Sequence, residues 1–293
     1  MAAAGAGGGK TYVDDVFSTY LYKGTGATKT ITNGIDLSSK GGMVWIKNRD
    51  SSFNNTLFDT VRGTAKILRS SSYGNETVGS QTLTAFNDNG FTLGTDSMVN
   101  SNNDDTVSWT FRKTEGFFTI CQWTGDDSGS RQISHDLGCQ PGLIILKNRS
   151  RNGTNWMAWH RDFSATQFLE LNATSAVNTD STLFGGSGAA KPTSTNFTIG
   201  GGESANKNGD DFIAYLFAGG ESTAATARSV EFANNEYLES SSSDYDIGTG
   251  DFTAELWFKT DSTSIQRLFD KRTGSNTAGG VLSIWNSQLY WHS

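Results

Sequence analysis

The chain has 293 residues, a formal net charge of −7, and only 18% charged residues. This sparse supply of Lys and Arg argues against binding to DNA, RNA or an anionic membrane surface, because affinity for these polyanions comes mainly from basic side chains. The sequence contains no apolar run near the roughly 18 residues that a membrane span needs, so we expect no membrane insertion. The length suits two or three domains of about 100 residues, each able to bury its own core.

The composition favours strands and turns over helices. Aromatic residues make up 12% of the chain, Gly occurs 34 times, Pro only twice, and Ser, Thr, Asn and Asp dominate between the apolar runs. Strands favour aromatic and β-branched residues, whereas turns favour Gly, Asn and Asp. Apolar residues nowhere accumulate at a 3.6-residue period. We therefore expect an all-β protein.

The N-terminus reads as a short arm. Residues 1–10, "MAAAGAGGGK", contain almost nothing to bury, so we predict a flexible arm over residues 1–15. The segment also lacks the basic start and bulky apolar stretch of a signal peptide. We expect a protein that is made in the cytoplasm without an export signal.

Most of the following sequence occurs twice. "GGMVWIKNR" (41–49) returns as "PGLIILKNR" (141–149) after one hundred residues, in both cases as an apolar run followed by Lys-Asn-Arg. Both faces of these runs are apolar, as in a central strand that is covered on both sides. The repeat defines two tandem antiparallel β-sandwich modules, over residues 16–115 and 116–218.

Three further pairs of segments extend the repeat. We interpret the first pair as two strands around a turn of small residues, with a short helix as the alternative, and the others as further strands. The pairs are 57–68 with 159–171, 89–94 with 195–200, and 104–111 with 210–217.

The segment "DDTVSWTF" (104–111) alternates in polarity. Val107, Trp109 and Phe111 share one face of an extended chain, and Ser108 and Thr110 share the other. This alternation predicts a half-buried antiparallel strand.

The sequence changes character after the second module. Residues 219–228 are small and polar without an apolar anchor, which indicates a linker. Residues 229–293 share no register with the modules, and "YLES", "GDFTAELWFK" and "RLFDKR" resemble the opening strands of a laminin-G-like, concanavalin-type jelly roll. Such folds generally exceed 100 residues. We therefore expect an incomplete jelly roll, as a fragment or with strands supplied by a partner.

The tandem modules also resemble a known group of proteins. "LYKGTGATKTITNGIDL", "MVWIKNR", "NGFTLG" and "FFTICQWTG" are similar to a domain repeated in structural proteins of marine tailed phages, where it accompanies laminin-G-like segments in tail fibres and other appendages. The resemblance implies a virion location, contacts with other virion proteins, and self-association as a homo-oligomer, most often a trimer. It supplies no catalytic residues.

One polar loop occupies the same place in both modules. "NSNNDD" (100–105) and "NKNGDD" (206–211) are rich in the oxygen ligands that Ca²⁺ takes. The candidate ligands for such a metal are Asp104, Asp105, Asp210 and Asp211. The same residues also suit a tight turn between strands, and we favour the turn.

Other polar groups fail to form a catalytic motif. Ser134, His135 and Asp136 are consecutive, so in a strand they point to opposite faces and cannot relay a proton to one another. We interpret the other candidates as surface, solvent-facing or unreactive groups: the pair His160 and Asp162, the strand carboxylates Glu170 and Glu255, and the thiols Cys121 and Cys139. We expect no enzyme and no cofactor apart from the Ca²⁺ alternative.

These observations lead to one expected function and two alternatives. The expected function is that of a phage virion structural protein, part of a tail fibre or similar appendage, that attaches the particle to the host surface through glycans. The first alternative is a capsid decoration or portal-proximal structural protein without a receptor role. The second is a polysaccharide depolymerase, which requires two suitably spaced carboxyl groups.

Overall fold

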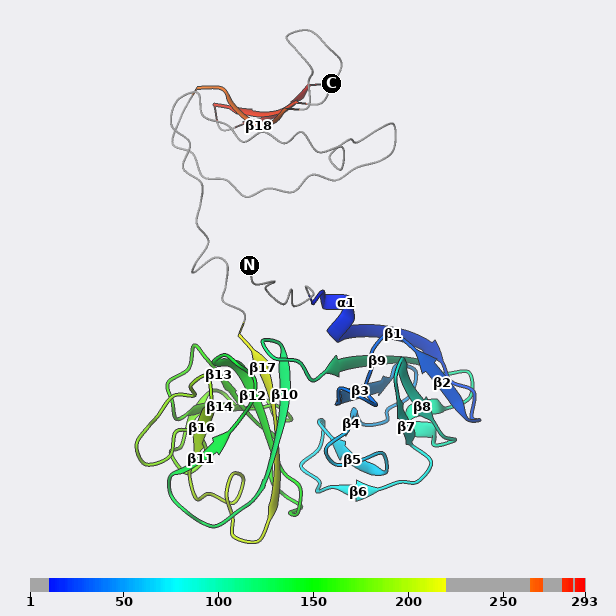
Figure 1. Cartoon of the computed structure of the whole chain (residues 1–293), viewed down its shortest axis with the longest axis vertical. Helices are drawn as coiled ribbons and strands as arrows, with labels where there is room; N and C mark the ends of the chain where they lie inside the picture. Colours follow the sequence, from blue (N-terminus) through cyan, green and yellow to red (C-terminus); the bar gives the residue numbers. More distant parts are fainter. Residues whose placement is uncertain (1–10, 220–263, 271–280, 287, 293) are drawn as a thin grey trace, which may run out of the picture. The chain divides into compact units, whose positions relative to one another are not determined.

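The computed structural model describes residues 11–219, 264–270, 281–286 and 288–292. The described residues form an all-β protein, as predicted, in which the strands pair antiparallel. The chain divides into two compact units, Met1–Ser229 and Val230–Ser293. Figure 1 shows two groups of strands in the first unit, coloured blue to cyan and green to yellow.

The first module is a β-sandwich of a large sheet and a small sheet. The large sheet contains, in spatial order, β1 (Phe17–Lys23), β9 (Asp105–Arg112), β3 (Gly42–Asn48), β4 (Thr56–Asp59), β5 (Lys66–Arg69) and β6 (Thr77–Val78). The small sheet contains β2 (Lys29–Thr32), β8 (Gly90–Leu93) and β7 (Leu83–Asn87). Apolar side chains from both sheets meet in one core, which includes Ile31, Val44, Ile46, Phe58 and Phe91.

The second module repeats the large sheet. Its strands follow the same order: β10 (Phe118–Thr124), β17 (Asp211–Ala218), β12 (Pro141–Asn148), β13 (Met157–His160), β14 (Gln167–Glu170) and β15 (Asn178–Thr179). The small sheet has two strands, β11 (Arg131–Ser134) and β16 (Asn196–Ile199). Its core between the sheets includes Trp123, Ile144, Leu146, Trp159 and Phe197.

The paired segments at 57–68 and 159–171 are strands around a turn, as predicted. Strand β4 pairs with β5, and β13 pairs with β14, both antiparallel. The cross-strand partners also fix the equivalence of the modules, because Met43 faces Asp59 where Leu143 faces His160. Asp59 and His160 are therefore equivalent positions.

Two short helical turns belong to the first module. They are α1 (Val13–Val16) and α2 (Ser97–Asn100). Helix α1 overlaps the end of the arm predicted over residues 1–15. Its last residue, Val16, is buried and anchors the chain before β1. Residues 1–10 of that arm lie outside the described residues.

The large sheets of the two modules pack against each other. Their facing sides form a third apolar core, with Met43, Leu57 and Leu68 from the first module and Phe118, Ile120, Ile145, Trp156, Ile213 and Tyr215 from the second. The central strand β3 is thus covered on both sides, with Val44 in the sandwich and Met43 against the other module. This arrangement explains the apolar run on both faces of the repeated segment.

Residues 105–112 form the antiparallel strand β9, as the alternation in this segment predicts, but its polar side faces the core of the sandwich. Ser108 and Thr110 are fully buried inside the sandwich, while Phe111 faces the second module, with its ring centroid 5.3 Å from that of Phe217. Two hydroxyls of the polar side are bonded inside the sandwich: Asn33 donates to Thr110 Oγ1 over 2.8 Å, and Ser108 donates to the Tyr20 carbonyl over 3.4 Å. The second module packs on part of the apolar side, at Phe111, and this side is only half-buried, because Trp109 and Phe111 both remain partly exposed.

The C-terminal unit is described only in part. Three strands, β18 (Gln266–Asp270), β19 (Val281–Trp285) and β20 (Gln288–His292), form an antiparallel sheet in this order. The predicted linker beyond residue 219 and most of the predicted jelly-roll segment, 229–293, lie outside the described residues. None of the described helices is long and apolar enough to span a membrane.

Candidate functional site: the polar interface between the modules

A network of buried charges lies at the edge of the core between the modules. Arg62 follows β4 in the first module and is fully enclosed, and its Nε donates to Asp59 Oδ2 over 2.5 Å. The Tyr215 hydroxyl of the second module donates to the same Asp59 oxygen over 2.7 Å and accepts from Arg62 Nη2 at 3.3 Å. The ion pair of the first module is therefore completed by a side chain of the second.

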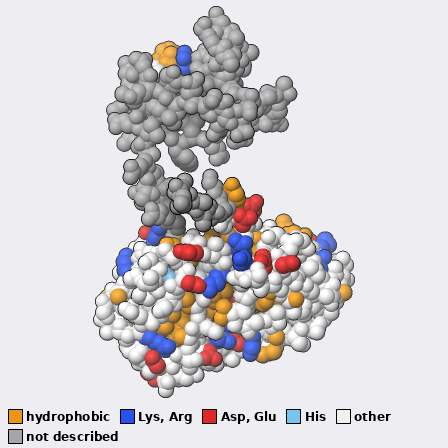
Figure 2. Space-filling model, viewed as in Figure 1, with side chains coloured by type: hydrophobic (Ala, Val, Ile, Leu, Met, Phe, Trp, Pro, Cys, Tyr) orange, Lys and Arg blue, Asp and Glu red, His pale blue; other side chains and the backbone are white. Residues whose placement is uncertain are grey.

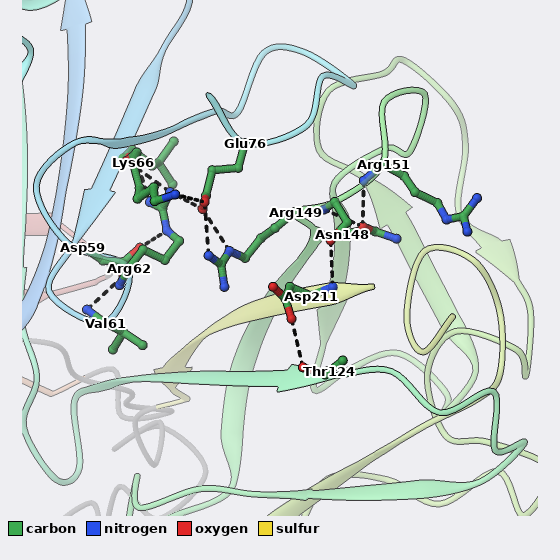
Figure 3. A network of polar contacts seen from close by, with 12 residues as sticks. Asp59, Val61, Arg62, Lys66, Glu76, Thr124, Asn148, Arg149, Arg151 and Asp211 are labelled. Atoms are coloured by element: carbon green, nitrogen blue, oxygen red, sulfur yellow. Dashed lines mark hydrogen bonds and ion pairs between the residues drawn. The ribbon is translucent and has the colours of Figure 1, made fainter. Parts of the chain in front are cut away.

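Glu76 extends this network to a second arginine. Its carboxylate lies between Arg62 and Arg149, as Figure 3 shows. Arg149 Nε and Nη2 donate to the two Glu76 oxygens over 2.9 and 3.1 Å, and Arg62 Nη1 lies 3.4 Å from Oε2. Such a two-pronged arginine–carboxylate pair is geometrically specific. The Glu76 backbone N–H also donates to the Arg149 carbonyl over 2.9 Å, so the loop before β6 is bound to the second module.

The network shifts the ionisation of its members. Burial acts against the charge of Glu76, but the hydrogen bond and the positive charges of Arg149 and Arg62 prevail and lower its pKa. Burial likewise acts against the charge of Arg62, yet the negative charges of Asp59 and Glu76 and the hydrogen bond to Asp59 raise its pKa. Burial is the main cause that raises the pKa of Tyr215 well above its usual value. The site therefore holds fixed charges and a neutral phenol at neutral pH, which suits a structural clamp rather than proton transfer.

Two more contacts reinforce this clamp. The Trp156 indole donates to the Arg69 carbonyl over 2.9 Å, and Lys147 Nζ donates to the Tyr73 carbonyl over 3.3 Å. Burial lowers the pKa of Lys147 to about 8. Lys147 also donates to the Thr154 carbonyl of its own module, and the equivalent Lys47 likewise donates to the Ser51 and Phe53 carbonyls of its own module.

The repeated Lys-Asn-Arg has a local structural role in each module. Asn48 Oδ1 accepts from the backbone N–H groups of Asp50 and Ser51, and Asn148 Oδ1 accepts from those of Ser150 and Arg151. Each asparagine thus closes the turn after the central strand.

The same asparagines bind two of the predicted metal-ligand candidates. Asn48 Nδ2 donates to Asp104 Oδ2 over 2.8 Å, and Asn148 Nδ2 donates to Asp210 Oδ2 over 2.9 Å. Asp210 also pairs with Arg151. These carboxylates therefore connect the repeated motif to the repeated acidic loop.

The neighbouring candidates lie at the first residues of β9 and β17. Asp105 pairs with Lys23 Nζ over 2.8 Å, and Asp211 Oδ1 accepts from the Thr124 hydroxyl over 2.9 Å. Hydrogen bonds, led by that of Asn48 for Asp104 and that of Lys23 for Asp105, lower the pKa of both carboxyl groups.

The acidic loops have the geometry of a matched turn. Asn103 and Gly209 occupy equivalent positions and both have positive φ, 66° and 78°. Asn and Gly are the residues that adopt this conformation most readily. The turn explains the composition of both loops. Within the described part of the chain, no group of three or more His, Cys, Asp or Glu side chains is arranged to hold a metal.

The remaining candidates are dispersed. Asp136 accepts from Thr119 Oγ1 over 2.5 Å and pairs with Lys113, while the His135 Nδ1 accepts from the backbone N–H of Leu137. Burial lowers the pKa of His135 and raises that of Cys121 to about 12. A thiol with a raised pKa is a poor nucleophile.

The pair His160 and Asp162 and the strand carboxylate Glu170 also lack a catalytic arrangement. His160 ends β13 and lies 3.4 Å from Asp162, which is in the following turn and largely exposed. The Glu170 carboxylate accepts from Asn155 and Ser175. Glu255 lies outside the described residues.

Sequence reasoning missed the buried network. Asp59 ends β4, Arg62 and Glu76 lie in a turn and a loop where charged residues are ordinarily solvated, and Tyr215 lies in an apolar run. The one available signal was the spacing of Asp59 and Arg62, but it also suits a surface turn. Their burial depends on contacts between segments more than 150 positions apart.

These features define an all-β protein in which two repeated sandwiches are joined into one body by a buried apolar and ionic interface. The chain belongs to the family described as Domain of unknown function (DUF7483), whose model matches residues 13–227. The matched region includes both modules. No curated protein and no solved structure matches the chain.

Proposed function

We propose that this protein is a structural component of a tailed-phage particle, in a tail fibre or similar appendage, and that it takes part in attachment to the host surface. The observation that carries the proposal is the joining of two β-sandwich modules through an extensive apolar and ionic interface. A rigid body of repeated all-β units suits a mechanical role in an assembled particle. The sequence resemblance to appendage proteins of marine phages points to the same role.

The disposition of reactive groups agrees with a scaffold. The buried charges of the network are engaged with one another, and the acidic loops bind their own turns. Figure 2 shows basic and acidic side chains interspersed over the visible face of the modules, without a large area of one sign. Such a surface offers little attraction to a polyanion. Exposed loops with Asn, Asp and Thr can hydrogen-bond the hydroxyl groups of host glycans.

The test is a reconstruction of the phage particle combined with a binding assay. We expect density for the modules in a tail appendage, and saturable binding of the full chain to host cells without release of new reducing ends from their polysaccharide. Density on capsids that lack tails, without cell binding, would support capsid decoration instead. Release of reducing ends would support a depolymerase.

A further inference from the structure

The interface between the modules joins non-equivalent strands. The first module contributes fully buried side chains from β3, β4 and β5, whereas the second contributes them mainly from β10, β17 and β12. By strand order, β10, β17 and β12 are equivalent to β1, β9 and β3. The contact is therefore heterologous, with a different face of each module in use. In a heterologous contact, each module keeps the face that is equivalent to the one its partner uses. That face remains available to bind a further module.

The first unused face lies on β1 and the adjoining parts of β9 and β3 in the first module. It borders the internal interface, where Met43, Trp45 and Phe111 pack against the second module. Tyr215 and Ile145, which are fully or nearly fully buried in the second module, correspond to Trp109 and Trp45 here. Both tryptophans are only partly buried, and their rings form an edge-to-face pair with centroids 6.3 Å apart. Leu21 lies at the rim of this face and is 62% exposed.

The second unused face lies on β13 and β14 of the second module. Leu57 and Leu68, which the interface buries to 2% and 0% exposure, correspond to Ala158 and Leu169. These two side chains are only partly buried. Leu171, directly after β14, is 41% exposed.

The polar members of the interface also have counterparts on the unused faces. Where the internal contact joins Asp59 to Tyr215, the equivalent positions carry His160 and Trp109. An imidazole and an indole replace a carboxylate and a phenol. The unused faces therefore carry a less charged version of the same contact, which favours association through aromatic and apolar packing.

We infer that the β1–β9–β3 face of the first module binds the β13–β14 face of the second module of another molecule of this chain. The contact repeats between molecules the one that joins the modules within a molecule. Repetition of this contact produces a closed ring when the rotation from each molecule to the next brings the last molecule back to the first. Otherwise it produces an open filament. A second copy is the favoured occupant because the internal interface shows that these two kinds of face fit each other. The inference holds for a protein inside or outside a virion.

Two charge variants test the inference on the full chain by sedimentation velocity over a wide range of concentration. We expect wild type to associate, and Leu21→Glu and Leu171→Glu each to weaken association about tenfold or more, equal to about 1.4 kcal/mol. Thr30→Glu is the matched control, because Thr30 is exposed on the outer side of the small sheet. A monomeric wild type, or an equal effect of the control, would overturn the inference.

A mixture of the two variants tests the heterologous geometry. Each variant retains one intact face, so an equimolar mixture should form dimers that cannot grow further. A contact between identical faces predicts no such recovery in the mixture. Failure of the mixture to dimerise, with wild type associating, would therefore reject the pairing of these two faces.

A photocrosslink locates the contact. A benzophenone amino acid in place of Trp109 should capture residues 157–163 of another molecule, because Tyr215 contacts Asp59 at the equivalent positions within one molecule. Isotope labelling of one partner separates crosslinks between molecules from those within one. Capture of residues 1–10 or 220–263 of the same molecule would show that the chain covers this face itself, and would overturn the inference.

Discussion

The two modules share their strand order and their loop chemistry but differ where they meet. In the first module, Asp59 ends β4 and Arg62 follows in the turn, and both side chains are completely buried against Tyr215. The equivalent position in the second module, His160, is exposed at the surface. The comparison teaches that duplication preserved the groups that shape each sandwich, and that the groups on the faces of the large sheets diverged according to what covers them.

The largest expected effect comes from removing the buried arginine. Arg62→Met leaves the Asp59 carboxylate without its ion-pair partner in a fully enclosed site, so we expect a loss of about 3–5 kcal/mol in the free energy of unfolding. Urea denaturation followed by tryptophan fluorescence measures it. His160→Ala, at the position equivalent to Asp59, should change stability by no more than about 0.5 kcal/mol. Similar losses in the two variants would contradict the contrast between the modules.

Removing one hydroxyl from the interface should have a smaller effect. Tyr215→Phe deletes the donor to Asp59 and leaves a buried carboxylate oxygen with one partner fewer, which should cost about 1–3 kcal/mol. Tyr22→Phe is the control within the first module, where the hydroxyl donates to the Val99 carbonyl over 2.6 Å. We expect about 1 kcal/mol there, since that acceptor is neutral. A larger loss for the control would argue against a special role of the interface charge.

The repeated asparagine should behave alike in both modules. Asn48→Ala and Asn148→Ala each remove a fully buried side chain that closes a turn and binds the acidic loop, and each should cost about 1–2 kcal/mol. The two losses in the free energy of unfolding, measured by urea denaturation, should agree to within about 0.5 kcal/mol. A large loss in one module and none in the other would show that the shared motif no longer has a shared role.

The interface should also give stability a pH dependence. Because Arg149 and Arg62 lower the pKa of Glu76 below its unfolded value, its carboxylate stabilises the fold above about pH 4.3, and this contribution is lost as pH falls through the folded pKa. Glu76→Gln should be less stable than wild type by about 1 kcal/mol at pH 7, and the difference should shrink toward pH 3. Thermal melting across this range measures it. Glu170→Gln, a carboxylate variant in the second module, serves as the control. A difference independent of pH would contradict the ion pairing.

The smallest expected effect concerns the acidic loops. Asp104 and Asp210 already accept hydrogen bonds from Asn48 and Asn148, so added Ca²⁺ or a chelator should leave the melting temperature of wild type unchanged. Asp210→Asn should show the same indifference to Ca²⁺. A rise in wild-type melting temperature with Ca²⁺ that Asp210→Asn abolishes would instead establish a cation site.

The repeat could be read from the sequence because it depends on local chemistry. A four-residue apolar run before Lys-Asn-Arg requires a covered strand followed by a capped turn, and Asn103 and Gly209 mark a turn that needs positive φ. The hairpin of β4 and β5 follows in the same way from the strand pattern and the small residues of its turn. These features involve neighbours along the chain, so their order in the sequence is enough to predict them.

The sequence by itself therefore determined an all-β chain with a duplicated strand pattern and matched turns, since these depend on residue type and spacing. Only the tertiary structure decided that the large sheets pack against each other, that Ser108 and Thr110 face inward, and that Arg62 is buried under Tyr215. Alternation in a strand assigns residues to two faces without saying what covers either one. The residues that cover these faces lie between 77 and 156 positions away in the sequence, and the packing of whole sheets brings them together.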